Sequence, residues 1–300
     1  MQKFFANLQA IKIENALYVV STPIGNLNDI TLRALTILEE VDFVLCEDSR
    51  VSMQLLKFYN IKDKKLLIYN DHSNQNDRQR VLEILNQGKS VALISDAGTP
   101  LISDPGYKLI NFLNIKNKKI ISVPGASALT SAISISGIAC NQFLFLGFLP
   151  NSGVQKEKII KNTPSNYSSI FFESANRCLE TLEIVNKING NEILVSVVKE
   201  ITKIHEEVIF GKIEYVIDFF NKNPDKLKGE FVIIIQKNES DNLDLSKDEI
   251  TENIKKLLKQ NKSAKDISTE ISFIYGINKK EIYKIVLKLI NDNDKKKAKK

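Results

Sequence analysis

The residue types on which many active sites depend are scarce in this chain. Among its 300 residues there are only two histidines, His72 and His205, and three cysteines, Cys46, Cys140 and Cys178. An odd number of widely spaced cysteines argues against a disulfide framework and against a zinc site, so we expect no metal and a reducing, cytoplasmic compartment. No apolar run reaches the ~18 residues of a membrane span, and residues 1–15 show no signal-peptide pattern. We therefore expect no membrane partner.

Three familiar phosphate-binding or catalytic motifs are also missing. Gly88-Lys89-Ser90 ends like a P-loop, but Glu83 stands where that motif requires a glycine. Residues 125–129 (G-A-S-A-L) lack the second glycine of a nucleophile elbow, and no G-x-G-x-x-G follows the first apolar run. An enzyme without these motifs takes its reactivity from a cofactor or from its substrate.

Positive charge is concentrated at one end of the chain. Residues 251–300 contain 14 lysines against 6 acidic residues, an excess of +8, whereas the first 250 residues have a net charge of −2. A basic terminal segment is typical of proteins that contact polyanions such as nucleic acids. Because a general bias toward Lys, Asn and Ile accounts for this charge equally well, charge alone leaves nucleic-acid binding open.

The first half of the chain alternates between short apolar runs and amphipathic segments. This order is typical of a parallel sheet with crossover helices, so we predict an α/β domain over residues 16–140. The predicted strands are 17–20, 43–46, 66–69, 91–94 and 119–123, and the predicted helices are 31–40, 51–59, 77–87 and 107–113.

A second, different pattern begins at residue 141. Strands are predicted at 169–172, 193–198, 206–210 and 231–235, with a long helix at 177–189. The two middle strands are separated by too few residues for a crossover helix, so they should pair antiparallel. We therefore predict a second α/β domain with a mixed sheet over residues 141–237.

The C-terminal part contains a linker, a helical module and a tail. Polar residues 238–249 are interpreted as the linker, residues 250–291 as the helical module and residues 292–300 as a disordered Lys-rich tail. Within the module, two amphipathic segments are joined by a short turn at 275–278, as in a helix-turn-helix, although small three-helix bundles share this pattern. Residues 1–15 are treated as an N-terminal extension with no assigned role.

Four loops follow predicted strands of the first domain, and they should gather at one edge of the sheet, where open α/β sheets bind ligands. The most distinctive is S-D-A-G-T-P-L-I-S-D-P-G at 95–106, whose glycines allow close approach to the main chain and whose prolines restrict its shape. The others are S-T-P-I-G-N at 21–26, E-D-S-R at 47–50 and P-G-A-S at 124–127. As alternatives, Asp48 or Ser49 caps a helix and Arg50 pairs with Glu47.

Taken together, these segments resemble the tetrapyrrole methylase superfamily of S-adenosylmethionine-dependent methyltransferases. Further matching motifs are V-P-G-A-S-A, G-F-L-P, F-F-E-S-A-N-R and K-G-E, which begin at residues 123, 147, 171 and 228. The resemblance runs from about Leu17 to about Leu289 and is most specific to the branch that methylates the 2′-hydroxyl of a cytidine in 16S rRNA at the decoding centre. Asn176 departs from this pattern, because a histidine is usual there.

The resemblance implies a fold, a cofactor and partners. It implies two α/β domains of the tetrapyrrole methylase type with a small helical C-terminal appendage, a homodimer, and 16S rRNA or the small ribosomal subunit as partner. It places S-adenosylmethionine in the cleft between the two domains. The residues that it assigns to the cofactor are Pro23, Gly25, Asp96, Gly98, Thr99, Pro100, Ile102, Ser127 and Ala128. Alternatively, Asp96 and Asp104 brace their loop by accepting hydrogen bonds from main-chain N–H groups.

Candidate catalytic residues are chosen by position alone. A ribose hydroxyl is a poor acid, so methyl transfer to it benefits from a base, and Glu47 and Asp48 are the candidates. Asn26 is a candidate orienting group and Arg50 a candidate phosphate anchor.

Two other functions stay open. A tetrapyrrole C-methyltransferase would need many cationic partners for the carboxylates of its substrate, and this chain has only five arginines. A non-catalytic RNA-binding protein of ribosome assembly would have no use for three intact loops that fit a methyl donor, namely those at 21–26, 95–106 and 124–127.

Overall fold

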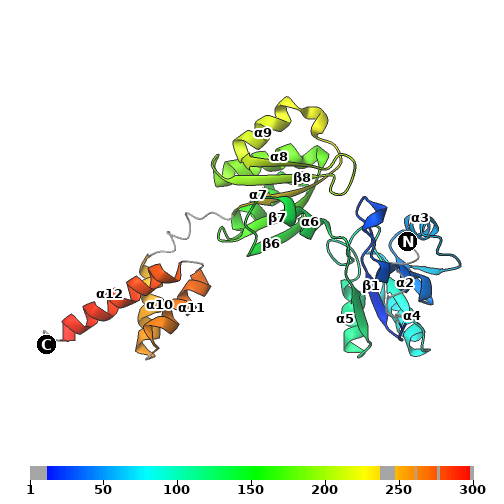
Figure 1. Ribbon diagram of the computed structural model, residues 1–300, viewed down its shortest axis with the longest axis horizontal. Helices are drawn as coiled ribbons and strands as arrows, with labels where there is room; N and C mark the ends of the chain where they lie inside the picture. The colour runs from blue at the N-terminus through cyan, green and yellow to red at the C-terminus, as the bar shows by residue number, and fades with distance from the viewer. Residues whose placement is uncertain (1–11, 237–246, 261, 276–277, 298–300) are drawn as a thin grey trace, which may run out of the picture.

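A five-stranded, wholly parallel sheet forms the first part of the molecule (Figure 1). The computed structural model describes residues 12–236, 247–260, 262–275 and 278–297. The strand order is β3-β2-β4-β1-β5, and each neighbouring pair is parallel. The strands are β1 Leu17–Val20, β2 Phe43–Cys46, β3 Lys65–Ile68, β4 Val91–Leu93 and β5 Ile120–Val123.

Helices cover both faces of this sheet, which is why its central strands are continuous apolar runs. The helices are α2 Leu32–Glu40 and α3 Ser49–Phe58 on one face, and α4 Gln75–Asn86 and α5 Tyr107–Ile115 on the other. Successive residues of β1 point to opposite faces, so Tyr18 lies in the core under α2 and α3 and Leu17 in the core under α4 and α5. The predicted parallel sheet with crossover helices is confirmed.

The second sheet is mixed, as predicted, with the order β6-β7-β10-β8-β9. Only β6 and β7 are parallel; the other neighbours, including the predicted pair β8 and β9, are antiparallel. The strands are β6 Phe143–Phe148, β7 Ser168–Ser174, β8 Leu194–Lys199, β9 Glu207–Lys212 and β10 Glu230–Ile235. The prediction omits β6, an apolar run that contains Gly147, because a glycine weakens the sequence signal of a strand.

Helices also cover both faces of the second sheet, as Figure 1 shows. They are α7 Gly153–Asn162, α8 Ala175–Asn189 and α9 Ile213–Lys222 on one face, and α6 Ala128–Ile135 on the other. Although α6 follows directly on the first sheet and falls within the predicted first domain, its Ala132 lies in a core with Val232 and Ile234 of β10. Ile24, from the loop after β1, packs against the same core. The loops at the edge of the first sheet are therefore held against the second.

The C-terminal helices form a separate bundle with its own apolar core (Figure 1). They are α10 Lys247–Lys259, α11 Ala264–Tyr275 and α12 Lys279–Lys297. The predicted limits of the module were too narrow: α10 begins inside the predicted linker, and α12 continues into the predicted tail. The expectation of disorder is wrong for residues 292–297, because lysine favours helix and is stabilised near a helix C-terminus. Residues 238–246 and 298–300 of the predicted linker and tail lie outside the described residues.

The last residues of the predicted N-terminal extension belong to the first domain. Asn15 Nδ2 donates to the carbonyl oxygens of Leu85 at 2.8 Å and of Lys89 at 2.6 Å, and Ile13 packs against the core under α2 and α3. Residues 1–11 of the extension lie outside the described part. Over the described ranges, no helix combines the length and the apolar character that crossing a membrane requires.

Candidate active site

The loops that follow β1, β4 and β5 meet at the carboxyl edge of the first sheet. Thr22 N–H donates to the Gly98 carbonyl at 2.8 Å, and Gly98 N–H donates to the Thr22 carbonyl at 3.1 Å. The Thr99 hydroxyl donates to the Ala126 carbonyl at 3.0 Å and lies 2.9 Å from the Ser21 hydroxyl, which donates to it. One threonine side chain thus joins three loops that are far apart in the sequence.

Two glycines permit this close approach. Gly98 has a φ of +79°, and a Cβ there would lie 3.1 Å from Ile24 Cγ2. A Cβ on Gly125 would lie 2.9 Å from Ser21 Cβ. A side chain at either position would push neighbouring loops apart.

The fourth predicted loop, after β2, joins the other three through Asp96. Asp48 N–H donates to Asp96 Oδ1 at 3.2 Å, so Asp96 binds the main chain of the neighbouring loop. The Asp48 carboxylate accepts hydrogen bonds from the N–H of Arg50 at 2.8 Å and from its Nε at 3.0 Å, and it caps α3. The alternative pairing of Arg50 with Glu47 is wrong, because the guanidinium bonds Asp48 and its side chain is otherwise 87% exposed.

A cavity of about 490 Å³ lies between these loops and the second sheet, within the ~300–1,000 Å³ typical of small-molecule sites. The structure places seven of the predicted site residues on its lining. These are Glu47, Asp96, Gly98, Thr99, Ile102, Ser127 and Ala128.

The other predicted residues do not line the cavity. Pro23 and Pro100 are buried, and Asp48 and Arg50 bond each other. Gly25 and Asn26 face a turn of the second domain: Asn26 N–H donates to Thr202 Oγ1 at 3.1 Å, and a Cβ on Gly25 would lie 2.6 Å from Lys203 Cγ. The Asn26 side chain caps the short 3₁₀ turn Leu27–Asp29. These two residues therefore lie at a contact between the two domains.

Sequence reasoning assigned no role to the residues that the second sheet contributes to the cavity. They include Phe148, Phe172, Glu173, Gly229 and Glu230. All five lie in the matched motifs G-F-L-P, F-F-E-S-A-N-R and K-G-E, so the available signal was the motif itself. What was missing was the position of β6, β7 and β10 opposite the loops of the first sheet.

The K-G-E segment (228–230) packs closely against the turn at 200–203, which also contacts Asn26. Gly229 has a φ of +88°, and a Cβ there would lie 2.2 Å from Glu200 Oε1. The Glu200 carboxylate is fixed, because it accepts hydrogen bonds from Glu230 N–H at 3.0 Å and from Lys203 Nζ at 2.8 Å. Only glycine fits at position 229 without displacing this carboxylate.

The cavity is strongly acidic. The acidic residues on its lining are Glu47, Asp96, Asp104, Glu173 and Glu230, and among the described residues no lysine, arginine or histidine lines it. The Glu173 carboxylate is fully buried and pairs with Arg177, so the negative charge of the cavity comes from the other four. Burial raises the pKa of Glu47, and the negative charges of Asp96 and Asp104 raise it further. In contrast, the hydrogen bonds from Arg50 lower the pKa of Asp48 to about 2. The cavity therefore suits a cationic ligand, and Glu47 is a better base than Asp48.

Asp104 is expected to make the protein less stable as the pH rises from about 4 to about 6. Burial raises its pKa from 3.8 to about 6, against the opposing hydrogen bond from Ser95. In that window the native state holds a proton that the unfolded chain has lost, so the free energy of unfolding falls with rising pH. Asp104→Asn should raise the urea midpoint at pH 7.5 and change it little at pH 4.5. A difference that is independent of pH would contradict this assignment.

The described residues hold no group of three or more histidine, cysteine, aspartate or glutamate side chains arranged to bind a metal ion. The three cysteines are free thiols.

Comparison with known proteins adds a family and a set of relatives. The model of the family described as Tetrapyrrole (Corrin/Porphyrin) Methylases matches residues 16–216. The chain is 42% identical over 286 residues to Ribosomal RNA small subunit methyltransferase I of Rickettsia prowazekii (strain Madrid E), covering 92% of this chain and 98% of that protein. It is 39% identical over 279 residues to the protein of the same name from Pasteurella multocida (strain Pm70), with the same two coverages, 92% and 98%.

Solved structures support the fold. A diphthine synthase matches with a TM-score of 0.56 at 15% identity, covering 74% of this chain and 90% of that one. A cobalt precorrin-4 methyltransferase matches with a TM-score of 0.53 at 17% identity, covering 74% and 95%. At such low identity these matches concern the fold alone, and they confirm the predicted pair of α/β domains.

Proposed function

The chain belongs to the tetrapyrrole (corrin/porphyrin) methylase family, and from that premise we propose that it methylates the 2′-hydroxyl of a cytidine in 16S rRNA at the decoding centre. The observation that carries the proposal is the similarity to a ribosomal RNA small subunit methyltransferase I. The two sequences are 42% identical over 92% of this chain and 98% of that protein. The methyl donor of this family is S-adenosylmethionine, which supplies a methyl group already activated on a positively charged sulfur.

The acidic cavity fits this donor. S-adenosylmethionine carries a sulfonium and an ammonium against one carboxylate. A lining whose described residues include carboxylates and no basic side chain complements this charge. The loop residues 96–99, which include Gly98 with its φ of +79°, line the cavity beside the space for the donor. Ser127 and Ala128 start α6, which has no side-chain cap, so the first N–H groups of this helix are suited to the donor carboxylate.

Glu47 is the residue that we assign as general base. It lines the cavity, and its raised pKa increases its ability to accept a proton. In the proposed step the ribose oxygen forms a bond to the methyl carbon, the bond from that carbon to sulfur breaks, and Glu47 takes the hydroxyl proton. The two domains align the reacting groups and exclude water, and such alignment is worth up to ~7–11 kcal/mol in well-oriented systems.

We propose that α12 contacts RNA phosphates. Its outward face carries Lys280, Lys284 and Lys288 beside the exposed Tyr283. Changing the three lysines to glutamine should weaken binding to 16S rRNA and flatten its salt dependence, because fewer counterions are released. The matched control changes the exposed Lys255, Lys256 and Lys259 of α10 to glutamine, which removes the same charge from the same bundle. Equal weakening by both triple variants would contradict a specific role of α12.

We also propose that the protein works as a homodimer in the cytoplasm, where ribosomal subunits are assembled. Light scattering at micromolar concentration tests the dimer, and a monomeric mass would contradict it.

Transfer of labelled methyl groups tests the proposed function. The protein is incubated with labelled S-adenosylmethionine and one of three acceptors: 16S rRNA, small subunits reassembled from unmodified 16S rRNA, or a porphyrinoid. Nuclease digestion locates the label in RNA. A 2′-O-methylcytidine product is expected. Label in a porphyrinoid acceptor, or no transfer despite donor binding, would overturn the proposal in favour of a tetrapyrrole methyltransferase or of a non-catalytic assembly protein.

A further inference from the structure

The donor cavity has an exposed aromatic ring on its lining. Phe148, the last residue of β6, lines the cavity and is 61% exposed. Phe172 of β7 packs edge-on against it, with ring centroids 5.4 Å apart and ring planes at 64°. Phe231 lines the same cavity but is only 2% exposed. Among the aromatic rings of the cavity, Phe148 therefore offers the largest free surface.

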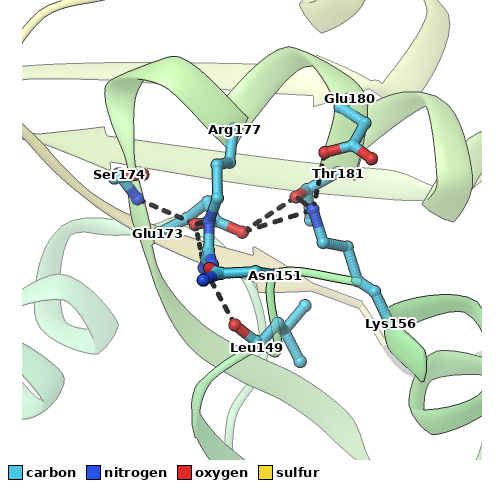
Figure 2. A network of polar contacts seen from close by, with 8 residues as sticks. All are labelled: Leu149, Asn151, Lys156, Glu173, Ser174, Arg177, Glu180 and Thr181. Carbon is cyan, nitrogen blue, oxygen red and sulfur yellow. Dashed lines mark hydrogen bonds and ion pairs between the residues drawn. The ribbon is translucent and has the colours of Figure 1, made fainter. Parts of the chain in front are cut away.

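The strand ends that carry these two rings are joined by one guanidinium (Figure 2). Arg177 Nη2 donates to the carbonyl oxygen of Leu149, the residue after Phe148, at 2.9 Å. Its Nε donates at 2.6 Å to Glu173 Oε1, and Glu173 directly follows Phe172. Arg177 thus links the residue after Phe148 to the residue after Phe172, and this link helps to fix the relative position of the two rings.

Glu173 is itself held on every side. Its Oε1 accepts a hydrogen bond from Ser174 N–H at 2.9 Å, and its Oε2 accepts one from Thr181 Oγ1 at 2.8 Å. Lys156 Nζ lies 3.9 Å from Glu173 Oε2 and donates to Thr181 Oγ1 at 2.8 Å and to Glu180 Oε2 at 3.0 Å. The side chains of Lys156 and Glu173 are fully buried. A buried polar network in which every member is paired is rigid, because each unpaired group would be costly at low dielectric.

We propose that Phe148, supported by Phe172, is the surface on which the target nucleobase stacks during methyl transfer. This inference rests on the proposed methylation of an RNA ribose. In-line transfer requires the ribose oxygen about 3–3.5 Å from the methyl carbon, so the base on the same ribose has to lie at the cavity too. RNA-binding proteins hold unstacked bases against aromatic rings. The carboxylates of the cavity repel phosphates, which leaves the uncharged base and ribose as the part of the RNA that enters.

Substitution of Phe148 tests this assignment against a matched control. Phe148→Ala should lower kcat/KM for 16S rRNA by about 5- to 150-fold, the effect of losing one stacked base, with an unchanged Kd for S-adenosylmethionine. Phe148→Tyr keeps the ring and should retain most of the activity. The control is Phe58→Ala: Phe58 is also 61% exposed, but it lies at the end of α3 and does not line the cavity.

Arg177→Lys tests the positioning role of the guanidinium, because it keeps the charge and removes the planar fork. It should raise KM for RNA without changing donor affinity, and combined with Phe148→Ala it should cause no further loss. Additive losses would show that Arg177 acts elsewhere.

Four results would overturn the inference. Wild-type kcat/KM in Phe148→Ala would remove the ring from RNA recognition. A higher Kd for S-adenosylmethionine in Phe148→Ala would assign the Phe148 ring to the donor site. A changed sedimentation coefficient would assign the ring to a subunit contact. If the wild-type protein itself labels no RNA, the proposed function fails first and the inference fails with it.

Discussion

Glu47→Gln is expected to slow methyl transfer by about 10²–10⁴-fold, the usual contribution of a general base, while the methyl donor still binds. Glutamine keeps the shape of the side chain and loses its ability to accept a proton. Glu47 lines the cavity, and burial together with the charges of Asp96 and Asp104 raises its pKa. Single-turnover methylation of 16S rRNA measures the chemical step, and titration calorimetry measures donor binding.

The adjacent carboxylate provides the control for this prediction. Asp48 bonds Arg50 and caps α3, and its pKa is lowered to about 2, so it is a weak base turned toward another partner. Asp48→Asn should slow the single-turnover rate far less than Glu47→Gln does. Equal losses in the two variants, or an unchanged rate in Glu47→Gln, would remove Glu47 from the role of base.

Glu173→Ala is expected to lower the free energy of unfolding by about 3–5 kcal/mol, the usual cost of removing one partner of a buried ion pair. Arg177 loses the carboxylate with which it pairs, whereas Lys156 keeps Glu180. The variant deprives Arg177, Thr181 and the Ser174 N–H of their shared acceptor (Figure 2). The chain has no tryptophan, so urea unfolding is followed by far-ultraviolet circular dichroism. Amide exchange on β7 and β10 then shows whether the loss is centred on the second sheet.

Glu180→Ala is the matched variant, because both glutamates lie beside the same buried Lys156. The Glu180 side chain is 51% exposed and lies 3.0 Å from Lys156 Nζ. An ion pair with one exposed partner contributes about 0–1 kcal/mol, and Lys156 keeps its hydrogen bond to Thr181. If the two variants are destabilised equally, burial of Glu173 is not the cause.

The first sheet could be predicted because buried parallel strands and amphipathic crossover helices have distinct periodicities. The convergence of the four loops follows from that topology, since the carboxyl ends of parallel strands share one edge. The second sheet was predicted less completely. The strand β6 was missed at Gly147, and α6 was placed with the first sheet by sequence proximity although it packs on the second.

Local patterns in this chain determined the parallel sheet, the position of the four loops at its carboxyl edge and the motifs of its family. Only the tertiary structure decided which individual side chains line the cavity and which bind other residues. Glu47 and Asp48 are neighbours of the same chemistry, yet one lines the cavity and the other binds Arg50. Helix α3 begins at Ser49, directly after Asp48, and Asp48 caps its first N–H groups. The places of Phe148 and Glu173 depend on the packing of β6 and β7 opposite the loops of the first sheet. The periodicity of a strand does not encode which distant segment it contacts.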